Sequence, residues 1–284
     1  MKKFLFITLA GALTLAACTK DYGNIVVTSS VDDVELVNLN FSTYSTEPMT
    51  KAPVDLTSLI TRLDVYIIEG TDTLIVNQVK NEDAGFGSVT ASLKKTKTYT
   101  LYAIGHKGYG PAELDESSLS FPDNRITDTF FYSGTFCPGN TTSLNCTMNR
   151  IVGMFKLTIT DELPEDLAKV QFSISETALG YNVGSGSLAN VSDRLVTINN
   201  PSSAQDGSTT FKIYALATST ASSIDVTVTA LSAEDDVIEE RIFQDVPIKA
   251  GYISAYTGTF FITTGMSLSF IGPEDWVSFD GQTY

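Results

Sequence analysis

Histidine is almost absent from this chain, since His106 is the only one among 284 residues. A Ser-His-Asp hydrolase would have to use that one imidazole, and the Gly-x-Ser-x-Gly turn of α/β-hydrolases is also missing. The chain has no His-Glu-x-x-His motif and no Gly-rich phosphate loop. His106 follows Ile104-Gly105 at the end of a strand pattern, so we expect a surface-loop histidine rather than a catalytic base. No cofactor and no metal is expected, and the protein is predicted not to be an enzyme.

Positive charge is scarce as well. Lys and Arg number 18 against 33 Asp and Glu, and the formal net charge is -15. Such a chain is repelled by phosphate backbones, so nucleic acid is not an expected partner. Beyond the first eighteen residues, no apolar run approaches the roughly 20 residues of a membrane helix.

Cysteine occurs three times, at Cys18, Cys137 and Cys146. The last two bracket Pro138-Gly139-Asn140, a turn sequence that would bring neighbouring strands together. An exported protein can form a disulfide there, and two unpaired, partly buried thiols are the alternative.

The first eighteen residues have the layout of a secretory signal peptide. Lys2 and Lys3 precede a short run dominated by apolar residues, which ends in Leu15-Ala16-Ala17-Cys18. Small residues before a cysteine resemble the bacterial lipobox, which implies that Cys18 becomes the lipidated first residue of the mature chain. We therefore predict a signal peptide over 1–17 and a lipidated leader over 18–33, with the body held at a membrane by acyl chains.

The rest of the chain has the pattern of an all-β protein. Short runs rich in Val, Ile, Thr, Tyr and Phe alternate with Gly, Asn, Asp, Ser and Pro, and helical periodicity is almost absent. Many short strands with turns between them favour β-sandwiches. The first expected strand is Val34–Ser42.

An internal repeat supports two domains. Thr98-Tyr99-Thr100-Leu101-Tyr102-Ala103-Ile104 aligns with Thr210-Phe211-Lys212-Ile213-Tyr214-Ala215-Leu216. Each copy lies in the middle of its half, and a fresh strand pattern opens at Met148. We predict an N-terminal β-sandwich over 34–147 and a C-terminal β-sandwich over 148–284.

Some surface features are less specific. The acidic group Glu234-Asp235-Asp236 lies between two strand patterns and predicts a solvated hairpin tip. Four aromatic residues near loops could stack on sugars, although most aromatic residues must belong to the core. These are Tyr109, Tyr132, Tyr181 and Trp276.

Several motifs, taken in order, resemble the Bacteroidales fimbrillin superfamily. Besides the lipobox, the chain carries the following segments: Met49-Thr50-Lys51-Ala52-Pro53, Leu101-Tyr102-Ala103-Ile104-Gly105, Met148-Asn149-Arg150-Ile151-Val152-Gly153-Met154-Phe155 and Val246-Pro247-Ile248-Lys249-Ala250-Gly251-Tyr252. The resemblance implies two tandem transthyretin-like, Greek-key β-sandwiches. It also implies assembly with other fimbrial subunits by strand exchange, in which C-terminal strands act as donors. For the strand-like segment 266–271, pairing within its own domain and donation to a neighbouring subunit are both open.

The resemblance further implies how the chain is processed. Stalk subunits of this family lose the first strand after proteolysis at an arginine, but no arginine lies between Cys18 and Arg62. Only Lys51 is available in the loop, and cleavage there would make the protein a stalk or tip subunit. Retention of the strand and of the lipid on Cys18 favours an anchoring or accessory subunit.

The expected function is therefore structural or adhesive. We expect a lipid-anchored subunit of a fimbrium at the cell outer membrane, exposed at the surface, with host or bacterial glycans or proteins as further partners. The alternative is a surface glycan-binding lipoprotein of a polysaccharide-uptake system.

Overall fold

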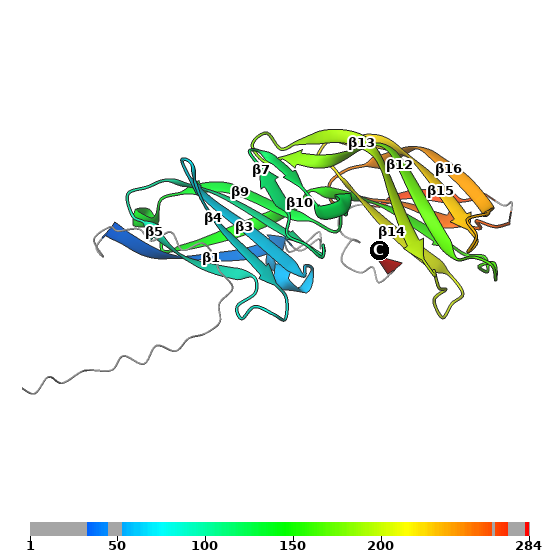
Figure 1. Cartoon of the computed structure of the whole chain (residues 1–284), viewed down its shortest axis with the longest axis horizontal. Coiled ribbons are helices and arrows are strands. Elements are labelled where there is room, and N and C mark those ends of the chain that lie inside the picture. Colours follow the sequence, from blue (N-terminus) through cyan, green and yellow to red (C-terminus); the bar gives the residue numbers. More distant parts are fainter. Residues whose placement is uncertain (1–32, 45–52, 263–264, 272–281, 284) are drawn as a thin grey trace, which may run out of the picture.

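A computed structural model describes residues 33–44, 53–262, 265–271 and 282–283. Its strands form two lobes, which follow one another along the long axis of the molecule (Figure 1). Within the described residues the chain is all-β, with short 3₁₀ turns and no α-helix, which confirms the all-β part of the prediction. None of the helices described has the length and apolar character needed to cross a membrane.

The first lobe is built from one sheet of the order β2-β1-β10-β9-β6-β3-β4, with β5 paired to β1. Its strands are β1 (Val34–Tyr44), β2 (Pro53–Asp55), β3 (Arg62–Glu69), β4 (Asp72–Val79), β5 (Ser88–Lys94), β6 (Tyr99–His106), β9 (Phe130–Phe136) and β10 (Ser143–Arg150). One buried hydrophobic cluster takes side chains from β1 and β5 and also from β3 and β6, so the sheet folds over on itself as a sandwich. This cluster is the first-lobe core.

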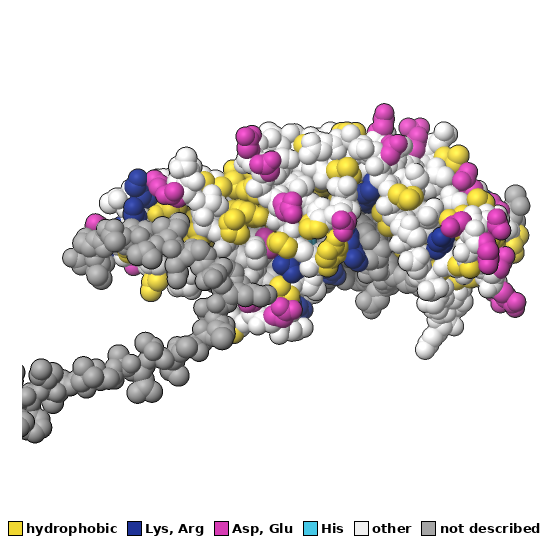
Figure 2. Space-filling view, in the orientation of Figure 1, with side chains coloured by type: hydrophobic (Ala, Val, Ile, Leu, Met, Phe, Trp, Pro, Cys, Tyr) yellow, Lys and Arg dark blue, Asp and Glu magenta, His cyan; other side chains and the backbone are white. Residues whose placement is uncertain are grey.

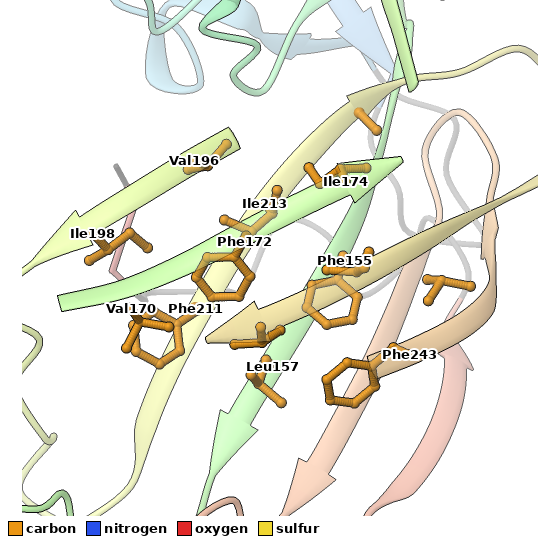
Figure 3. Close-up of a cluster of buried hydrophobic side chains, with 14 of the residues drawn as sticks. Phe155, Leu157, Val170, Phe172, Ile174, Val196, Ile198, Phe211, Ile213 and Phe243 are labelled. Carbon is orange, nitrogen blue, oxygen red and sulfur yellow. The ribbon is translucent and has the colours of Figure 1, made fainter. Parts of the chain in front are cut away.

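The second lobe is built from two facing sheets. One has the order β18-β17-β11-β14-β19, and the other has the order β16-β15-β12-β8-β7 with β13 paired to β12. The strands are β7 (Glu113–Asp115), β8 (Ser118–Ser120), β11 (Val152–Ile159), β12 (Lys169–Asn182), β13 (Ser187–Asn199), β14 (Thr209–Leu216), β15 (Ser222–Leu231), β16 (Val237–Ile248), β17 (Ile253–Gly258), β18 (Ser267–Ile271) and β19 (Gln282–Thr283). Between the sheets, Phe155 packs edge-on against Phe172 and Phe243 (Figure 3).

The hairpin β7–β8 connects the two lobes. It comes from the first half of the chain, yet Leu119 and Ser118 of β8 pair with Tyr181 and Asn182 of β12 in the second lobe. The sequence did not predict these two short strands. The predicted domain limits, 34–147 and 148–284, remain a prediction. The crossing hairpin (residues 113–120) falls within the first of these ranges, although it pairs with a sheet of the second lobe.

The sequence repeat lies on β6 and β14, and its alternation has a structural reason. In each copy one face of the strand enters the core of its own lobe: Tyr99, Leu101 and Ala103 in the first, Phe211, Ile213 and Ala215 in the second. The opposite face of each strand meets a third buried cluster, the junction cluster. Over 101–104 and 213–216, both strands therefore place apolar side chains on both faces.

The junction cluster joins the two lobes through contacts from both. Its first-lobe members include Tyr66, Ile104 and Phe131, and its second-lobe members include Met154 and Tyr214. Burial of this many apolar side chains favours a fixed arrangement of the lobes, because separating them would expose the cluster to water.

Acidic side chains are spread over the surface of both lobes (Figure 2). The group Glu234-Asp235-Asp236 connects β15 to β16, which confirms the predicted hairpin tip, and Asp235 forms an ion pair with Lys169. Strand β18 pairs antiparallel with β17 of its own chain, which is the within-domain arrangement of the two that the sequence left open.

Candidate functional site

Strand β1 lies between two other strands of the first lobe. Residues 34–40 pair antiparallel with β5, and residues 38–43 pair parallel with β10. The predicted strand Val34–Ser42 is thus present and extends to Tyr44. Because both edges of β1 form main-chain pairs, β1 joins β5 to β10 in one sheet.

The alternation along β1 sends every second side chain into the first-lobe core. Val37 and Leu39 are 0% exposed and Phe41 is 6% exposed, whereas Leu36 on the other face is 61% exposed. At about 1.5–3 kcal/mol for each buried apolar side chain, these three contribute on the order of 5–9 kcal/mol. That is comparable with the whole stability of an ordinary domain, about 5–15 kcal/mol.

The outer face of β1 is held by polar contacts to its neighbours. Thr90 of β5 donates a hydrogen bond to Asn38 over 2.8 Å, and the Asn40 amide donates to Ser143 and Asn145 of β10 over 3.3 Å each. On the inward face, in line with Val37, Leu39 and Phe41, the buried Thr43 hydroxyl donates to the Met148 carbonyl oxygen over 2.9 Å. A strand of another chain that replaced β1 would need the same alternation of apolar and polar side chains.

The two residues proposed for processing and lipidation, Lys51 and Cys18, lie outside the described residues. Arg62, the first arginine of the sequence, is the first residue of β3, and it pairs in register with Val79 and His106. Its backbone is therefore held in a sheet interior and is not in an extended loop.

Cys137 and Cys146 are both free thiols in the structure, which is the second of the two arrangements that the sequence left open. Cys146 points into the first-lobe core from β10, beside Phe41, and burial raises its pKa to about 12. Cys137 precedes the 3₁₀ turn Pro138–Asn140, and its Sγ donates to the Lys95 carbonyl oxygen over 3.1 Å. The turn aims Cys137 at the loop after β5, while the strand alternation aims Cys146 at the core.

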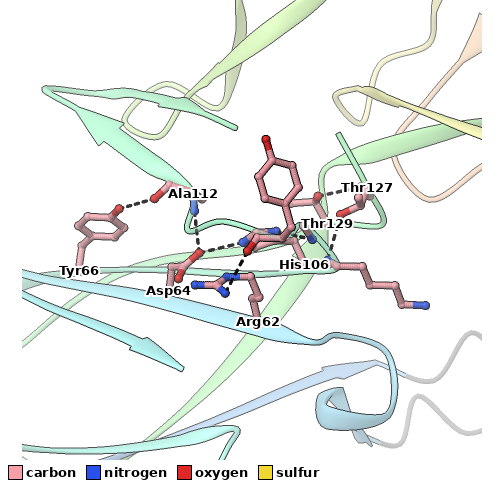
Figure 4. Close-up of polar contacts among 10 residues, drawn as sticks. Arg62, Asp64, Tyr66, His106, Ala112, Thr127 and Thr129 are labelled. Atoms are coloured by element: carbon pink, nitrogen blue, oxygen red, sulfur yellow. Dashed lines mark hydrogen bonds and ion pairs between the residues drawn. The ribbon is translucent and has the colours of Figure 1, made fainter. Parts of the chain in front are cut away.

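His106 is not a surface-loop residue, and this expectation was wrong. It is the last residue of β6 and is 0% exposed, as is Asp64 on the neighbouring strand β3. The imidazole Nε2 lies 2.8 Å from the Asp64 Oδ2 (Figure 4). In the sequence His106 stands near Gly105 and Gly108, and nothing there indicates its partner Asp64, which lies 42 positions away.

The same carboxylate holds the segment that leads to the crossing hairpin. The Ala112 backbone N–H donates to the Asp64 Oδ2 over 2.8 Å, and the Tyr66 hydroxyl donates to the Ala112 carbonyl oxygen over 2.6 Å (Figure 4). Burial raises the pKa of Tyr66 to about 12, and the Asp64 charge adds to this rise. The two side chains of β3 thus hold both polar groups of the Ala112 backbone at the point where the chain leaves the first lobe.

The aromatic residues considered for sugar stacking lie in different environments. Tyr181 belongs to the junction cluster, and Tyr132 packs against the first-lobe core. Only Tyr109 of the described three is well exposed, at 56%, and its hydroxyl donates to Asp123 while the Arg125 guanidinium lies 5.5 Å from its ring centroid. Trp276 lies outside the described residues. Within the described part of the chain, no group of three or more His, Cys, Asp or Glu side chains is placed to hold a metal ion.

No protein-family model and no curated protein matches this chain. Solved structures do match it in fold, at low sequence identity. A candidate cell adhesion protein from Bacteroides ovatus superposes with a TM-score of 0.52 at 13% identity, covering 87% of this chain and 99% of its own. A candidate adhesin from the same species gives 0.50 at 10% identity, over 84% and 98% of the two chains.

A third structure carries a different description. Candidate polysaccharide-binding proteins from Bacteroides thetaiotaomicron give a TM-score of 0.52 at 8% identity, over 83% of this chain and 96% of that chain. At such identities the likeness concerns the fold alone. The comparisons therefore confirm that this chain has an all-β, sandwich-like fold, shared over most of its length with candidate adhesins and candidate polysaccharide-binding proteins of Bacteroides.

Proposed function

We propose that the protein is a non-catalytic subunit of a cell-surface fimbrium, an anchoring or accessory subunit held at the outer membrane by acyl chains on Cys18. The observation that carries the proposal is the position of β1 in the first-lobe core. Val37, Leu39 and Phe41 are buried there, so the lobe depends on this strand or on a strand of the same pattern. The leader ending at Cys18 and the adhesin-like fold support the same conclusion.

Strand exchange is the proposed means of joining subunits. A sheet edge left open by one missing strand accepts main-chain hydrogen bonds from an added strand, and alternate side chains fill the groove. In this chain the groove between β5 and β10 is filled by the protein's own β1. The first arginine of the mature chain is locked in β3, so an arginine-specific protease has no loop site between Cys18 and that strand. A subunit that keeps β1 accepts no donor strand there, which suits the terminal position of an anchor.

The mature N-terminus tests this proposal directly. Mass spectrometry of the protein isolated from intact cells should find acylated Cys18 at the first position. A mature chain starting at Ala52 would instead show cleavage after Lys51, loss of β1 and a polymerising subunit.

A substitution tests the role of the lipid separately. Cys18→Ser should release the protein from the outer-membrane fraction and reduce fimbriae attached to the cell, because one hydroxyl cannot take the acyl chains. Cys137→Ser, which changes a half-buried thiol in the folded body, is the matched control and should leave fractionation unchanged. Membrane association that survives Cys18→Ser would contradict the anchor.

Glycan binding is the second candidate function. It is favoured by the exposed Tyr109 ring beside Arg125 and Asp123, since aromatic faces next to charged side chains suit sugars. Calorimetry against a panel of polysaccharides should then show binding that Tyr109→Ala abolishes. Flat isotherms for the unchanged protein would exclude this function and leave the fimbrial one untouched.

A further inference from the structure

The exposed ring of Tyr109 is held in place from several sides. Its hydroxyl donates to the Asp123 carboxylate, and the Arg125 guanidinium carbon lies over the ring, 5.5 Å from its centroid. At the backbone, the Arg62 Nη1 donates to the Tyr109 carbonyl oxygen over 3.4 Å. The ring is nevertheless 56% exposed. A ring that is already ordered loses little conformational entropy when a ligand packs on it, which favours binding.

The residues next to Tyr109 in the chain leave space beside the ring. Gly108 and Gly110 flank it and carry no side chain. Arg125 covers part of the ring, and the remaining surface is open to water. A sugar presents an apolar C–H face that can pack on such a surface, while its hydroxyl groups stay in contact with water or with polar side chains.

Two cations near the ring have no acidic partner. Elsewhere in the described residues, Lys97, Arg150 and Lys169 form ion pairs with carboxylates. Arg62 and Lys107 form none within the part of the chain that the structure describes. Arg62 contacts the backbone of the ring residue, and Lys107 is exposed two positions before it. Their charges are therefore available to an anion that binds beside the ring.

Nearby acidic side chains compensate for these charges only in part. Asp123 is exposed and accepts from the ring hydroxyl, whereas Asp64, on the same strand as Arg62, is 0% exposed and faces the protein interior. Glu113 is the next acidic residue along the chain and begins the crossing hairpin. In the space-filling view, Lys and Arg side chains gather near the middle of the molecule, whereas Asp and Glu are most numerous at the far end of the second lobe (Figure 2).

The net charge of the chain does not decide what binds at this position. The formal charge of -15 would repel an anion at long range. At physiological ionic strength, however, charges more than about 8 Å away are largely screened. A small anion beside the ring therefore responds mainly to Arg62, Lys107, Arg125 and Asp123, three positive charges against one negative charge.

We propose that the surface around Tyr109 binds a sugar that carries a carboxylate, such as a uronic acid residue of a polysaccharide. The sugar ring packs on Tyr109, and its carboxylate is attracted by Arg62, Lys107 and Arg125. Asp123 accepts a hydrogen bond from a sugar hydroxyl. This inference rests on the second candidate function, glycan binding, and names the class of sugar.

An oligogalacturonate and its methyl ester test the role of charge. The two probes share the sugar ring and the linkage, and only the acid is charged. Isothermal titration calorimetry at low salt should show that the acid binds about fivefold or more tightly than the ester, since each exposed ion pair contributes modestly. The preference should disappear at about 1 M salt, where the screening length is about 3 Å.

The outcomes separate this inference from the function on which it rests. Equal affinities for the acid and the ester, or binding of neutral polysaccharides alone, would overturn the charge preference and leave glycan binding intact. Flat isotherms for both probes and for the neutral polysaccharides would reject glycan binding itself, and this inference with it.

Matched substitutions locate the site. Lys107→Gln removes one exposed charge and should weaken binding of the acid about two- to fivefold, with no change for the ester. Lys95→Gln makes the same change at a 40% exposed side chain near the opposite end of β6, and should leave both affinities unchanged. Tyr109→Ala should abolish binding of both probes. Equal losses in Lys107→Gln and Lys95→Gln would show attraction to the overall charge and refute the proposed site.

Discussion

Tyr102 in β6 and Tyr214 in β14 occupy the same position of the sequence repeat, and they contact the junction cluster from opposite lobes. Tyr214 is 4% exposed within the cluster, and Tyr102 is half-buried and stacks on Phe131 with ring centroids 6.0 Å apart. Residues of the repeat therefore contribute to the junction cluster between the lobes as well as to the cores of both lobes.

The first prediction concerns this contact. Tyr214→Ala should lower the free energy of unfolding by about 3–5 kcal/mol, as for other large buried aromatic side chains. Tyr109→Ala, at a 56% exposed position, should change it by about 0.5 kcal/mol or less. Urea denaturation of the two variants measures the difference, and equal effects would show that the cluster contributes little.

The second prediction concerns the first strand. Leu39→Ala should destabilise the protein by about 2–5 kcal/mol, because it leaves a cavity in the first-lobe core. Leu36→Ala, on the outer face of the same strand, should cost about 0.5 kcal/mol or less. Thermal unfolding measures both. A protein that tolerates Leu39→Ala as well as Leu36→Ala would not depend on β1, against the proposed retention of the strand.

The third prediction concerns the two thiols. Iodoacetamide should modify Cys137 in the folded protein and leave Cys146 unmodified, because Cys146 is 0% exposed and its pKa is raised to about 12 by burial. Mass spectrometry of peptides after labelling, with and without urea, reports both sites. A mass lower by two hydrogens that returns after reduction would instead show a disulfide.

The fourth prediction concerns alkaline pH. The pKa of Cys146 rises from 9.0 to about 12 on folding and that of Tyr66 from 10.0 to about 12, so between about pH 9 and 12 the unfolded chain has lost protons that the folded chain keeps. Stability therefore falls as the pH rises through this range, by about 1.4 kcal/mol per pH unit for each group at most.

A substitution identifies the group responsible. Cys146→Val removes one titrating group from the core and should make the alkaline loss of stability shallower, as measured by urea midpoints at several pH values. Cys137→Val changes the half-buried thiol and serves as control. A pH dependence that is the same in both variants would assign the loss to groups other than Cys146.

The fifth prediction concerns Gly108. Gly108→Ala places a methyl group 2.7 Å from the His106 Nδ1 and 2.9 Å from its Cε1, and should cost about 1–3 kcal/mol. Gly184→Ala meets its nearest atom, the Asn182 Oδ1, at 3.5 Å and should cost much less. Unfolding midpoints compare the two. A neutral Gly108→Ala would mean that the loop 107–112 adjusts freely.

Part of this fold could be predicted because its signals are local. Alternation of apolar and polar residues identifies β1, and the acidic run after β15 identifies a hairpin tip. Strand β4 and the hairpin β7–β8 were missed. In β4 only Gln78 is buried, and β7 and β8 are three residues each, too short for a periodic pattern.

The buried site could not be predicted for a different reason. His106 follows a strand pattern and stands between glycines, which suggests a loop, and nothing near it in sequence indicates a carboxylate partner. Asp64 reaches it only because β3 and β6 pair antiparallel, with Arg62 opposite His106. The same holds for Cys137 and Cys146, whose short separation suggested a bridge, whereas in the structure Cys146 lies in the first-lobe core and Cys137 contacts the Lys95 carbonyl oxygen.

The sequence by itself determined an acidic chain and β-strands with the faces they bury, and it predicts an exported leader ending in Cys18. These follow from side-chain chemistry and from a periodicity of two residues, which need no partner to be recognised. Tertiary structure alone decided that β1 lies between β5 and β10, that a hairpin crosses to the second lobe, and that Asp64 meets His106 out of contact with water. Those features depend on which strands pair and in what register, and pairing is set by packing between residues far apart in the chain.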